Sequence, residues 1–339
     1  MKFGTAGIRG LFGQEVSLRE TIAVCFAVNQ LLEGGRFGVG YDSRSTSFVL
    51  ATVAGSAMNW YGSDVEDFGL IPTPVLAYNI RRMHLHAGLS VTASHNPAEY
   101  AGVKVFGTDG IEFSLEEEHK VEELVRKSSE YTKHEDELVN FGTTTVVTNC
   151  IDLYSEAVMS NTLRSRRKFK ILVDCANGTS VQVTPRILSE LGHEVVTVNS
   201  HSSKSFPGRT PEPIPETLEE TAAFARFIGA DFGIAHDGDA DRLVMIDRRG
   251  VVVPDYAVCA LVLKIILERV RRGTLVISYN SSDALERIAK EAGCVVERSR
   301  LGKTFQELYS KRGIYACEPS KMVDPKWGYW EDGIYAAIL

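Results

Sequence analysis

The 339-residue chain lacks the features that mark several classes of protein. It contains no apolar run of about 18 residues and no apolar signal core behind Met1, so we expect neither a membrane span nor a secretory leader. Lys and Arg number 37 against 44 Asp and Glu, and the net charge of −7 gives no electrostatic support for nucleic-acid binding. The sequence therefore predicts a soluble cytoplasmic protein that binds neither nucleic acid nor membrane.

Cysteine is also sparse, and its spacing excludes two further kinds of site. The six cysteines are scattered, without a Cys-x-x-Cys pair and without the spacing of a metal finger. Several lie inside apolar runs, as in Ile171–Cys175. We expect small buried hydrophobic side chains in a reducing compartment, not disulfides or zinc ligands.

What the chain does contain is a regular alternation of strand-like and helix-like segments. The segment Arg36–Tyr41 has the pattern of a strand, residues 47–61 that of a helix, and His86–Ala93 that of a further strand. Such alternation predicts an α/β fold with mixed, mostly parallel sheets covered by helices. The length and spacing predict three consecutive α/β domains, with a suspected repeat that no sequence self-similarity reveals. We place them at residues 1–148, 149–249 and 250–339.

One stretch, Leu89–Pro97, takes a buried strand into a serine, a histidine and an Asn-Pro turn. Proline biases the residue before it toward extended geometry, so Ser94 and His95 should lie on a tight loop at the end of the strand. Ligands bind at that end of the strands in open α/β sheets. We therefore take Ser94 as a candidate covalent centre. The alternative is an ordinary turn in which the serine side chain bonds to nearby backbone.

A second candidate site follows another predicted strand, where three aspartates are separated by single small residues: Asp237, Asp239 and Asp241. In extended backbone these side chains point the same way, and three crowded carboxylates favour a bound cation. All-oxygen ligation suits Mg²⁺ or Ca²⁺. An EF-hand also begins with this spacing, but its sixth and twelfth positions need Gly and Glu, where this chain has Arg242 and Arg248. The pattern thus predicts a Mg²⁺ site.

A third feature is the glycine-rich run Phe3–Gly10, which contains Arg9. Its backbone N–H groups and guanidinium suit a phosphate, and the alternative is a flexible start of the chain. A serine on one strand-end loop and a Mg²⁺ cluster on another suggest phosphoryl transfer through a phosphoserine. This chemistry needs mainly positioning and charge neutralisation, which a metal ion and arginines supply.

Three ordered motifs, Phe3–Gly10, Thr92–Pro97 and Asp237–Arg242, resemble those of the α-D-phosphohexomutase family. The family comprises phosphomannomutases, phosphoglucomutases and phosphoglucosamine mutases. Its archaeal branch is the most similar, because of the loop Phe206–Arg209 and the segment Asp332–Tyr335. The resemblance implies an enzyme that interconverts the 1-phosphate and the 6-phosphate of a hexose, which is mannose, glucose or glucosamine. Hexose 1,6-bisphosphate would be its activator.

The resemblance also implies a role for each matching residue. Ser94 would give its phosphate to the sugar monophosphate, and would take back the other phosphate after the bisphosphate reorients. Mg²⁺ would be held by Asp237, Asp239, Asp241 and phospho-Ser94. The phosphoryl charge would be stabilised by Arg9 and Arg242, and the acid/base candidates are His95 and Lys104. The substrate would be contacted by Glu318, Ser320, Lys303 and Arg209. By itself, Lys104 is typical of an exposed strand lysine, and its place in the family's Gly-x-Lys pattern favours the catalytic role.

The chain departs from the family pattern in two places. The sugar-binding loop usually reads Gly-Glu-x-Ser-Gly-His, whereas Cys317–Met322 keeps the Glu and the Ser but loses both glycines and the histidine. The preferred sugar is therefore left open. The sequence stops at Leu339, where the linker to the family's fourth, phosphate-binding domain would start. We expect this domain to be absent, and three explanations stay open: the chain is a truncation, a second copy or a partner supplies the phosphate contacts, or the protein is a weakened mutase. Arg209 is a candidate to replace part of these contacts.

Two other functions compete with the mutase. A non-catalytic or weakened phosphosugar-binding paralogue would keep the fold without needing both the serine and the aspartate loops. A Mg²⁺-dependent sugar phosphatase would use Asp237 as an aspartyl nucleophile and would give Ser94 no role.

Overall fold

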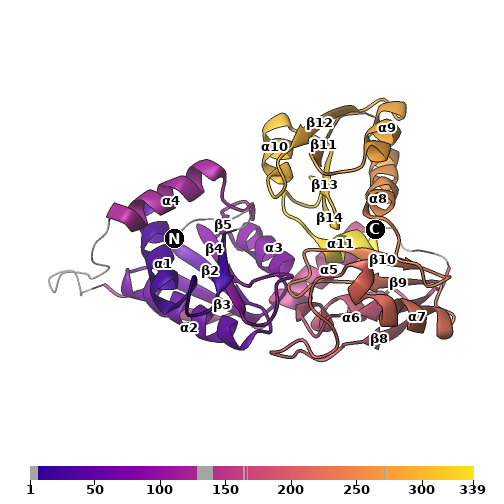
Figure 1. Cartoon of the computed structure of the whole chain (residues 1–339). Helices are drawn as coiled ribbons and strands as arrows, with labels where there is room; N and C mark the ends of the chain where they lie inside the picture. The colour runs from indigo at the N-terminus through magenta and orange to yellow at the C-terminus, as the bar shows by residue number, and fades with distance from the viewer. Residues whose placement is uncertain (1–6, 128–139, 163–164, 166, 271) are drawn as a thin grey trace. The chain divides into compact units, whose positions relative to one another are not determined.

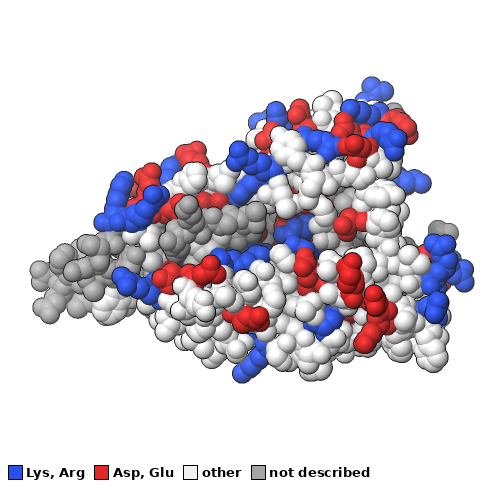
Figure 2. All heavy atoms as spheres, viewed as in Figure 1, with Lys and Arg blue, Asp and Glu red and all other residues white. Residues whose placement is uncertain are grey.

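The computed structural model describes residues 7–127, 140–162, 165, 167–270 and 272–339. Contacts within the chain divide it into two compact units, Met1–Cys150 and Ile151–Leu339, and each is described by itself. Among the described residues, every helix is too short or too polar to cross a bilayer. On the face shown in Figure 2, acidic and basic side chains are interspersed.

The first unit is built on a six-stranded mixed sheet in the order β1-β5-β4-β2-β3-β6. Its strands are β1 (Ile8–Leu11), β2 (Arg36–Tyr41), β3 (Asp64–Leu70), β4 (Ala87–Val91), β5 (Tyr100–Gly107) and β6 (Thr144–Val146). Strand β2 pairs in parallel with β3 and β4, and β3 pairs in parallel with β6. Strand β5 is antiparallel to both β4 and β1.

Helices cover both faces of this sheet (Figure 1). They are α1 (Leu18–Leu31), α2 (Ser45–Trp60), α3 (Thr73–Met83) and α4 (Leu115–Lys127). The first, second and fourth share one apolar core with Phe37 and Val39 of β2. Helix α3 packs on the opposite face, where Gly88 leaves room for Ile80, whose Cδ1 lies 2.3 Å from the place a Cβ would occupy.

The second unit contains two four-stranded sheets. One has the order β10-β9-β7-β8, and the other has the order β12-β11-β13-β14. The strands are β7 (Lys170–Asp174), β8 (Glu194–Val198), β9 (Phe232–Ala235), β10 (Val244–Asp247), β11 (Thr274–Ser278), β12 (Val295–Ser299), β13 (Tyr315–Glu318) and β14 (Lys321–Val323). The helices are α5 (Cys150–Asn161), α6 (Thr184–Glu190), α7 (Glu219–Phe227), α8 (Asp255–Arg269), α9 (Asp283–Glu291), α10 (Thr304–Lys311) and α11 (Gly333–Ile338), with 3-10 turns η2 (Thr179–Gln182) and η3 (Pro215–Thr217).

All three sheets contain the same four-strand arrangement. A first strand lies between two parallel neighbours, and a fourth strand is antiparallel to the third: β2-β3-β4-β5, β7-β8-β9-β10 and β11-β12-β13-β14. The suspected repeat is thus present in the topology. The turns between the third and fourth strands, at residues 92–99, 236–243 and 319–320, carry Ser94, the three aspartates and Ser320, and Glu318 ends the strand before the last turn.

The prediction of an α/β fold with mixed, mostly parallel sheets is confirmed. One sheet falls in each predicted domain, and the domain boundaries stay predictions. The glycine-rich run differs from the expected loop, because its described part enters strand β1 and Ile8 is buried in the core. Its first residues, 3–6, lie outside the described ranges. All six cysteines are free and buried, as predicted, and burial raises the pKa of Cys25 and Cys175 to about 12.

Candidate active site

Ser94 lies in the turn between β4 and β5 with a φ of +52°, in the left-handed region that few residues other than glycine adopt. Its N–H donates to Thr92 Oγ1 at 2.8 Å, and the Thr92 hydroxyl donates to Asp42 Oδ2 at 2.7 Å. Ser94 Oγ lies 3.4 Å from Nδ1 of His95. The structure therefore places the candidate nucleophile beside a candidate proton carrier, on a turn whose backbone is fixed by side-chain hydrogen bonds.

The buried guanidinium of Arg44 binds the backbone of the same turn. It donates to the carbonyl oxygens of Ser94 at 2.8 Å and Asn96 at 2.6 Å, and also to that of Pro97. Its Nε lies 2.9 Å from Asp42 Oδ2, and neither side chain of this ion pair is exposed. One arginine thus donates to three carbonyl oxygens of the turn. These hydrogen bonds and the ion pair with Asp42 explain how the buried guanidinium charge is tolerated.

We expect the substitution Arg44→Met to destabilise the first unit by about 3–5 kcal/mol, because it leaves the Asp42 carboxylate buried without its ion-pair partner. Lys120→Met is the matched control. Lys120 pairs with Glu116 in the same unit, and 52% and 78% of the two side chains are exposed, so its loss should destabilise the unit far less than the loss of Arg44. Urea unfolding of both variants measures the difference, and equal losses would contradict the role assigned to Arg44.

Lys104 lies in β5, opposite Ser90 of β4. It is buried, with its Nζ 3.9 Å from Glu112 Oε1. The reading of Lys104 as an exposed strand lysine is therefore wrong. A buried ammonium beside the strand that leads into Ser94 is compatible with acid/base work, and this role stays a prediction.

Arg9 lies in edge strand β1, opposite Gly102 of β5. It is half-buried. At Gly102 a Cβ would lie 2.6 Å from the carbonyl oxygen of Thr92 and 2.7 Å from that of Ile8. Glycine is thus required where β1 and the start of the Ser94 turn both approach β5. Arg9 is brought near this part of the sheet, and its contact with a phosphate stays a prediction.

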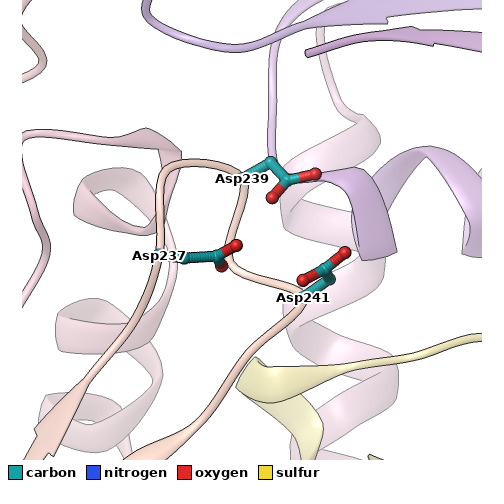
Figure 3. Close-up of side chains that lie close together, drawn as sticks. All are labelled: Asp237, Asp239 and Asp241. Carbon is teal, nitrogen blue, oxygen red and sulfur yellow. The ribbon is translucent and has the colours of Figure 1, made fainter. Parts of the chain in front are cut away.

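Asp237, Asp239 and Asp241 lie on the turn that joins β9 to β10. All three are buried, and one ligand oxygen from each lies within 4.8 Å of the others. Figure 3 shows their three carboxylates gathered around one space beside the turn. The expected extended backbone is wrong, because Ala240 has a φ of +61° and the chain folds back on itself. Close, buried carboxylate oxygens are the donors that Mg²⁺ prefers, so the residues present fit this ion.

Two cationic side chains flank the aspartates. The backbone N–H of Arg242 donates to Asp237 Oδ1 at 3.3 Å, and its Nε lies 3.9 Å from Oδ2 of the same residue. Lys321 Nζ lies 3.0 Å from Asp241 Oδ2. The structure therefore brings Arg242 to the metal turn, as the sequence motif indicates.

His236 closes the base of the metal turn. Its Nδ1 lies 2.8 Å from the carbonyl oxygen of Arg242, and its Nε2 lies 3.0 Å from Thr184 Oγ1. A carbonyl only accepts, so Nδ1 carries the proton and Nε2 accepts from the threonine hydroxyl. Burial lowers the pKa of His236 to about 4, which keeps the ring neutral. The imidazole thereby ties the residue before the aspartates to the residue after them.

Arg209 holds the metal turn in the way that Arg44 holds the serine turn. Its Nε donates to Asp174 Oδ2 at 2.8 Å and its Nη2 to the carbonyl oxygen of His236 at 2.6 Å. Burial by itself would raise the pKa of Asp174, but the charge and hydrogen bond of Arg209 bring it below its ordinary value. These contacts give Arg209 a positioning role, and its predicted contact with substrate stays a prediction.

Glu318 ends β13, and Ser320 lies in the turn that follows it. Glu318 Oε1 accepts hydrogen bonds from the N–H of Gly302 at 2.7 Å and from Thr304 Oγ1 at 2.8 Å. Ser320 has a φ of +61°, and its carbonyl accepts from the N–H of Leu243 at 2.8 Å, which links this turn to the metal turn. The structure also brings Lys303 close to Glu318, because Lys303 lies in the chain between Gly302 and Thr304, the two residues that donate to the Glu318 carboxylate.

The Glu318 carboxyl should make stability depend on pH. Its burial, and then the negative charge of Glu331, raise the pKa of Glu318 from 4.5 to about 7. The folded state therefore holds this proton more tightly than the unfolded state. The favourable contribution is complete below about pH 4.5 and is lost as the pH rises through 7.

We expect the wild type to lose on the order of 2–3 kcal/mol more stability than Glu318→Gln between pH 5 and pH 8. Melting curves at both pH values measure the difference. Glu307→Gln, on helix α10 and half-exposed in an ion pair with Lys311, is the control. An equal pH dependence in the wild type and Glu318→Gln would contradict the raised pKa.

Comparisons with known proteins agree with this arrangement. Residues 1–132 match the family phosphoglucomutase/phosphomannomutase, alpha/beta/alpha domain I, and residues 152–250 match alpha/beta/alpha domain II of the same family. The phosphopentomutase of Thermococcus kodakarensis is 37% identical over 330 residues, which cover 97% of this chain and 72% of that protein. The chain belongs to the α-D-phosphohexomutase family.

Other members of the phosphohexomutase family show the same extent of similarity. The probable phosphoglucosamine mutase of Pyrococcus horikoshii is 32% identical over 340 residues, which cover 99% of this chain and 74% of that protein. The crystal structure of a phosphoglucomutase/phosphomannomutase family protein from Burkholderia thailandensis has the same fold, with a TM-score of 0.87 and 22% identity over 98% of this chain and 75% of that one. The chain thus spans about three-quarters of the length of these family members.

Sequence reasoning missed four positioning residues of this family member: Asp42, Arg44, Asp174 and His236. Asp42, Asp174 and His236 each lie at the carboxyl end of an apolar strand. A polar residue at that place is the sequence signal that could have identified them. Arg44 follows Asp42 by two residues, which is a weak signal by itself. The carbonyl partners of Arg44 are distant in the sequence and are known only from the fold.

Proposed function

We propose that the chain is a phosphosugar mutase that interconverts hexose 1-phosphate and 6-phosphate through a phosphoserine at Ser94. The observation that carries the proposal is the cluster of three buried aspartates in a turn equivalent to that of Ser94, in a chain of the phosphohexomutase family. A plain sugar-binding protein needs neither a strained serine turn nor a buried set of metal ligands.

The residues divide the work as follows. A sugar hydroxyl attacks the phosphorus of phospho-Ser94, so that the new P–O bond forms as the bond to Ser94 Oγ breaks. His95, 3.4 Å from Oγ, is placed to return a proton to the leaving serine oxygen, and Lys104 is the candidate to take the proton from the sugar hydroxyl. After the bisphosphate reorients, the same steps run in reverse with the other phosphate.

Mg²⁺ held by Asp237, Asp239 and Asp241 would supply positive charge that stabilises the transferring phosphoryl group. Arg242 and Arg9 would add guanidinium charge to the same group. A phosphoryl oxygen of phospho-Ser94 as a further metal ligand stays a prediction of the family resemblance.

Glu318 and Ser320, with Lys303, are the proposed sugar contacts. A pocket of about 300 Å³ lies beside Glu318 and has a mixed lining, with Asp255, Asn280 and Ser282 among its polar residues and Cys259, Leu285 and Pro319 among its apolar ones. The polar side chains of this lining are the groups that would bond to sugar hydroxyls. A pentose phosphate is the second candidate substrate, because the phosphopentomutase of Thermococcus kodakarensis is 37% identical to this chain.

The test is a ³¹P NMR assay with Mg²⁺ and a trace of glucose 1,6-bisphosphate. Mannose, glucose, glucosamine and ribose 1-phosphates are offered separately, and conversion to the 6-phosphate, or to the 5-phosphate for ribose, identifies the substrate. Release of inorganic phosphate that survives Ser94→Ala would instead favour a phosphatase with Asp237 as nucleophile. Binding of sugar phosphates without turnover would favour the non-catalytic paralogue.

A further inference from the structure

We propose that Lys321 is a built-in counter-cation of the aspartate cluster, which stabilises the metal-free protein and weakens its affinity for Mg²⁺. The inference rests on the metal site of the proposed function. It goes further by assigning a role to a residue that lies outside the metal turn, on strand β14.

The geometry places the Lys321 ammonium between two carboxylates. Its Nζ lies 3.0 Å from Asp241 Oδ2 and also contacts Glu331 Oε2. The Lys321 side chain is 12% exposed, and those of Asp241 and Glu331 are 1% and 7% exposed. An ion pair so poorly solvated is screened little by water or salt, so its charge matters to the aspartates.

The backbone fixes this placement at both ends. Lys321 is paired with Glu318 in the register between β13 and β14. The preceding residue, Ser320, accepts a hydrogen bond from the N–H of Leu243, two residues after Asp241. The turn that carries the sugar contacts is therefore attached to the turn that carries the metal ligands, and Lys321 extends from the first to the second.

The balance of charge gives the direction of the effect. Three aspartates and Glu331 face two flanking cations, Lys321 and Arg242. Without metal, the Lys321 ammonium offsets part of the repulsion among the carboxylates. A divalent cation that binds Asp241 shares this ligand with a neighbouring positive charge, so Lys321 and Mg²⁺ weaken each other's binding.

The experiment compares Lys321→Met with Lys321→Arg and Lys326→Met in the full chain. Lys326→Met is the matched control, since Lys326 is an exposed lysine a few residues further along the same segment. Isothermal titration with MgCl₂ measures affinity, and melting in EDTA measures the metal-free protein. We expect Lys321→Met to bind Mg²⁺ at least fivefold more tightly and to melt at a lower temperature in EDTA. Lys321→Arg and Lys326→Met should match the wild type in both measurements.

The outcomes separate the inference from the function on which it rests. Unchanged or weaker Mg²⁺ binding by Lys321→Met, when Asp239→Asn abolishes binding, overturns the role of Lys321 and leaves the metal site standing. A wild type that binds no Mg²⁺ overturns the proposed metal site and the inference together. Lys321→Gln is the second neutral variant, and the Mg²⁺ affinity of this variant decides the question if Lys321→Met fails to fold.

Discussion

A Ser94→Ala variant, incubated with glucose 1,6-bisphosphate and Mg²⁺, is expected to carry no phosphate on the peptide that contains residues 92–99. Its mutase rate should fall by at least about 1,000-fold, because the oxygen that accepts and donates the phosphoryl group is gone. Peptide mass spectrometry measures the phosphate, and the coupled assay for sugar 6-phosphate measures the rate.

Two further variants make the Ser94 result specific. Ser94→Gly also removes the oxygen, but glycine adopts the φ of +52° without strain, so a misfolded turn cannot explain a loss of activity shared by both variants. Ser43→Ala removes another buried serine hydroxyl of the first unit and should leave phosphorylation unchanged. Full activity in Ser94→Ala or Ser94→Gly would refute the phosphoserine mechanism.

The second large effect is expected from Asp239→Asn, which removes one of the three clustered charges while keeping the shape of the side chain. The affinity for Mg²⁺ should fall by at least about 100-fold, because a carboxylate ligand is replaced by a weaker neutral one. In EDTA the variant should melt at a higher temperature than the wild type, because one source of like-charge repulsion is gone. In saturating Mg²⁺ the order of the melting temperatures should reverse.

Melting curves in EDTA and in MgCl₂ test this reversal directly. Asp283→Asn is the control for a change of one charge, since 90% of the Asp283 side chain is exposed. It should shift neither the affinity nor the order of melting. If Asp239→Asn melted below the wild type under both conditions, the cluster would be held by contacts other than metal binding.

The sequence predicts the central strands well and misses four edge strands. Strands β1, β6, β10 and β14 are three or four residues long and lie at the ends of their sheets. An edge strand of that length is too short to show a period of two, and it lacks the long apolar run of a strand buried on both faces. Two of the four, β10 and β14, are the antiparallel strands that make their sheets mixed, whereas in the first sheet this strand is the interior β5.

The candidate site divides in the same way. Ser94 is found from the sequence because a serine, a histidine and an Asn-Pro turn follow an apolar strand. The three aspartates are found because they alternate with small residues after another apolar strand. Their geometry is not found, since the aspartates converge through the left-handed Ala240 and not through extended backbone. The positioning contacts of Arg44 and Arg209 are also beyond sequence reasoning, because the carbonyl oxygens of Ser94, Asn96 and His236 that they bind lie 27 or more positions away in the chain.

The shared position of the three chemical turns has a consequence for how the chain folds. Each turn closes an antiparallel pairing of strands that are adjacent in sequence, β4 with β5, β9 with β10 and β13 with β14. Closing a short loop costs little chain entropy, whereas the parallel pairings require crossover connections that include a helix. We therefore expect these hairpins to be among the first tertiary contacts to form, whereas the hydrogen bonds from Arg44 and Arg209 that fix the serine and aspartate turns form later, as the sheets around them are completed.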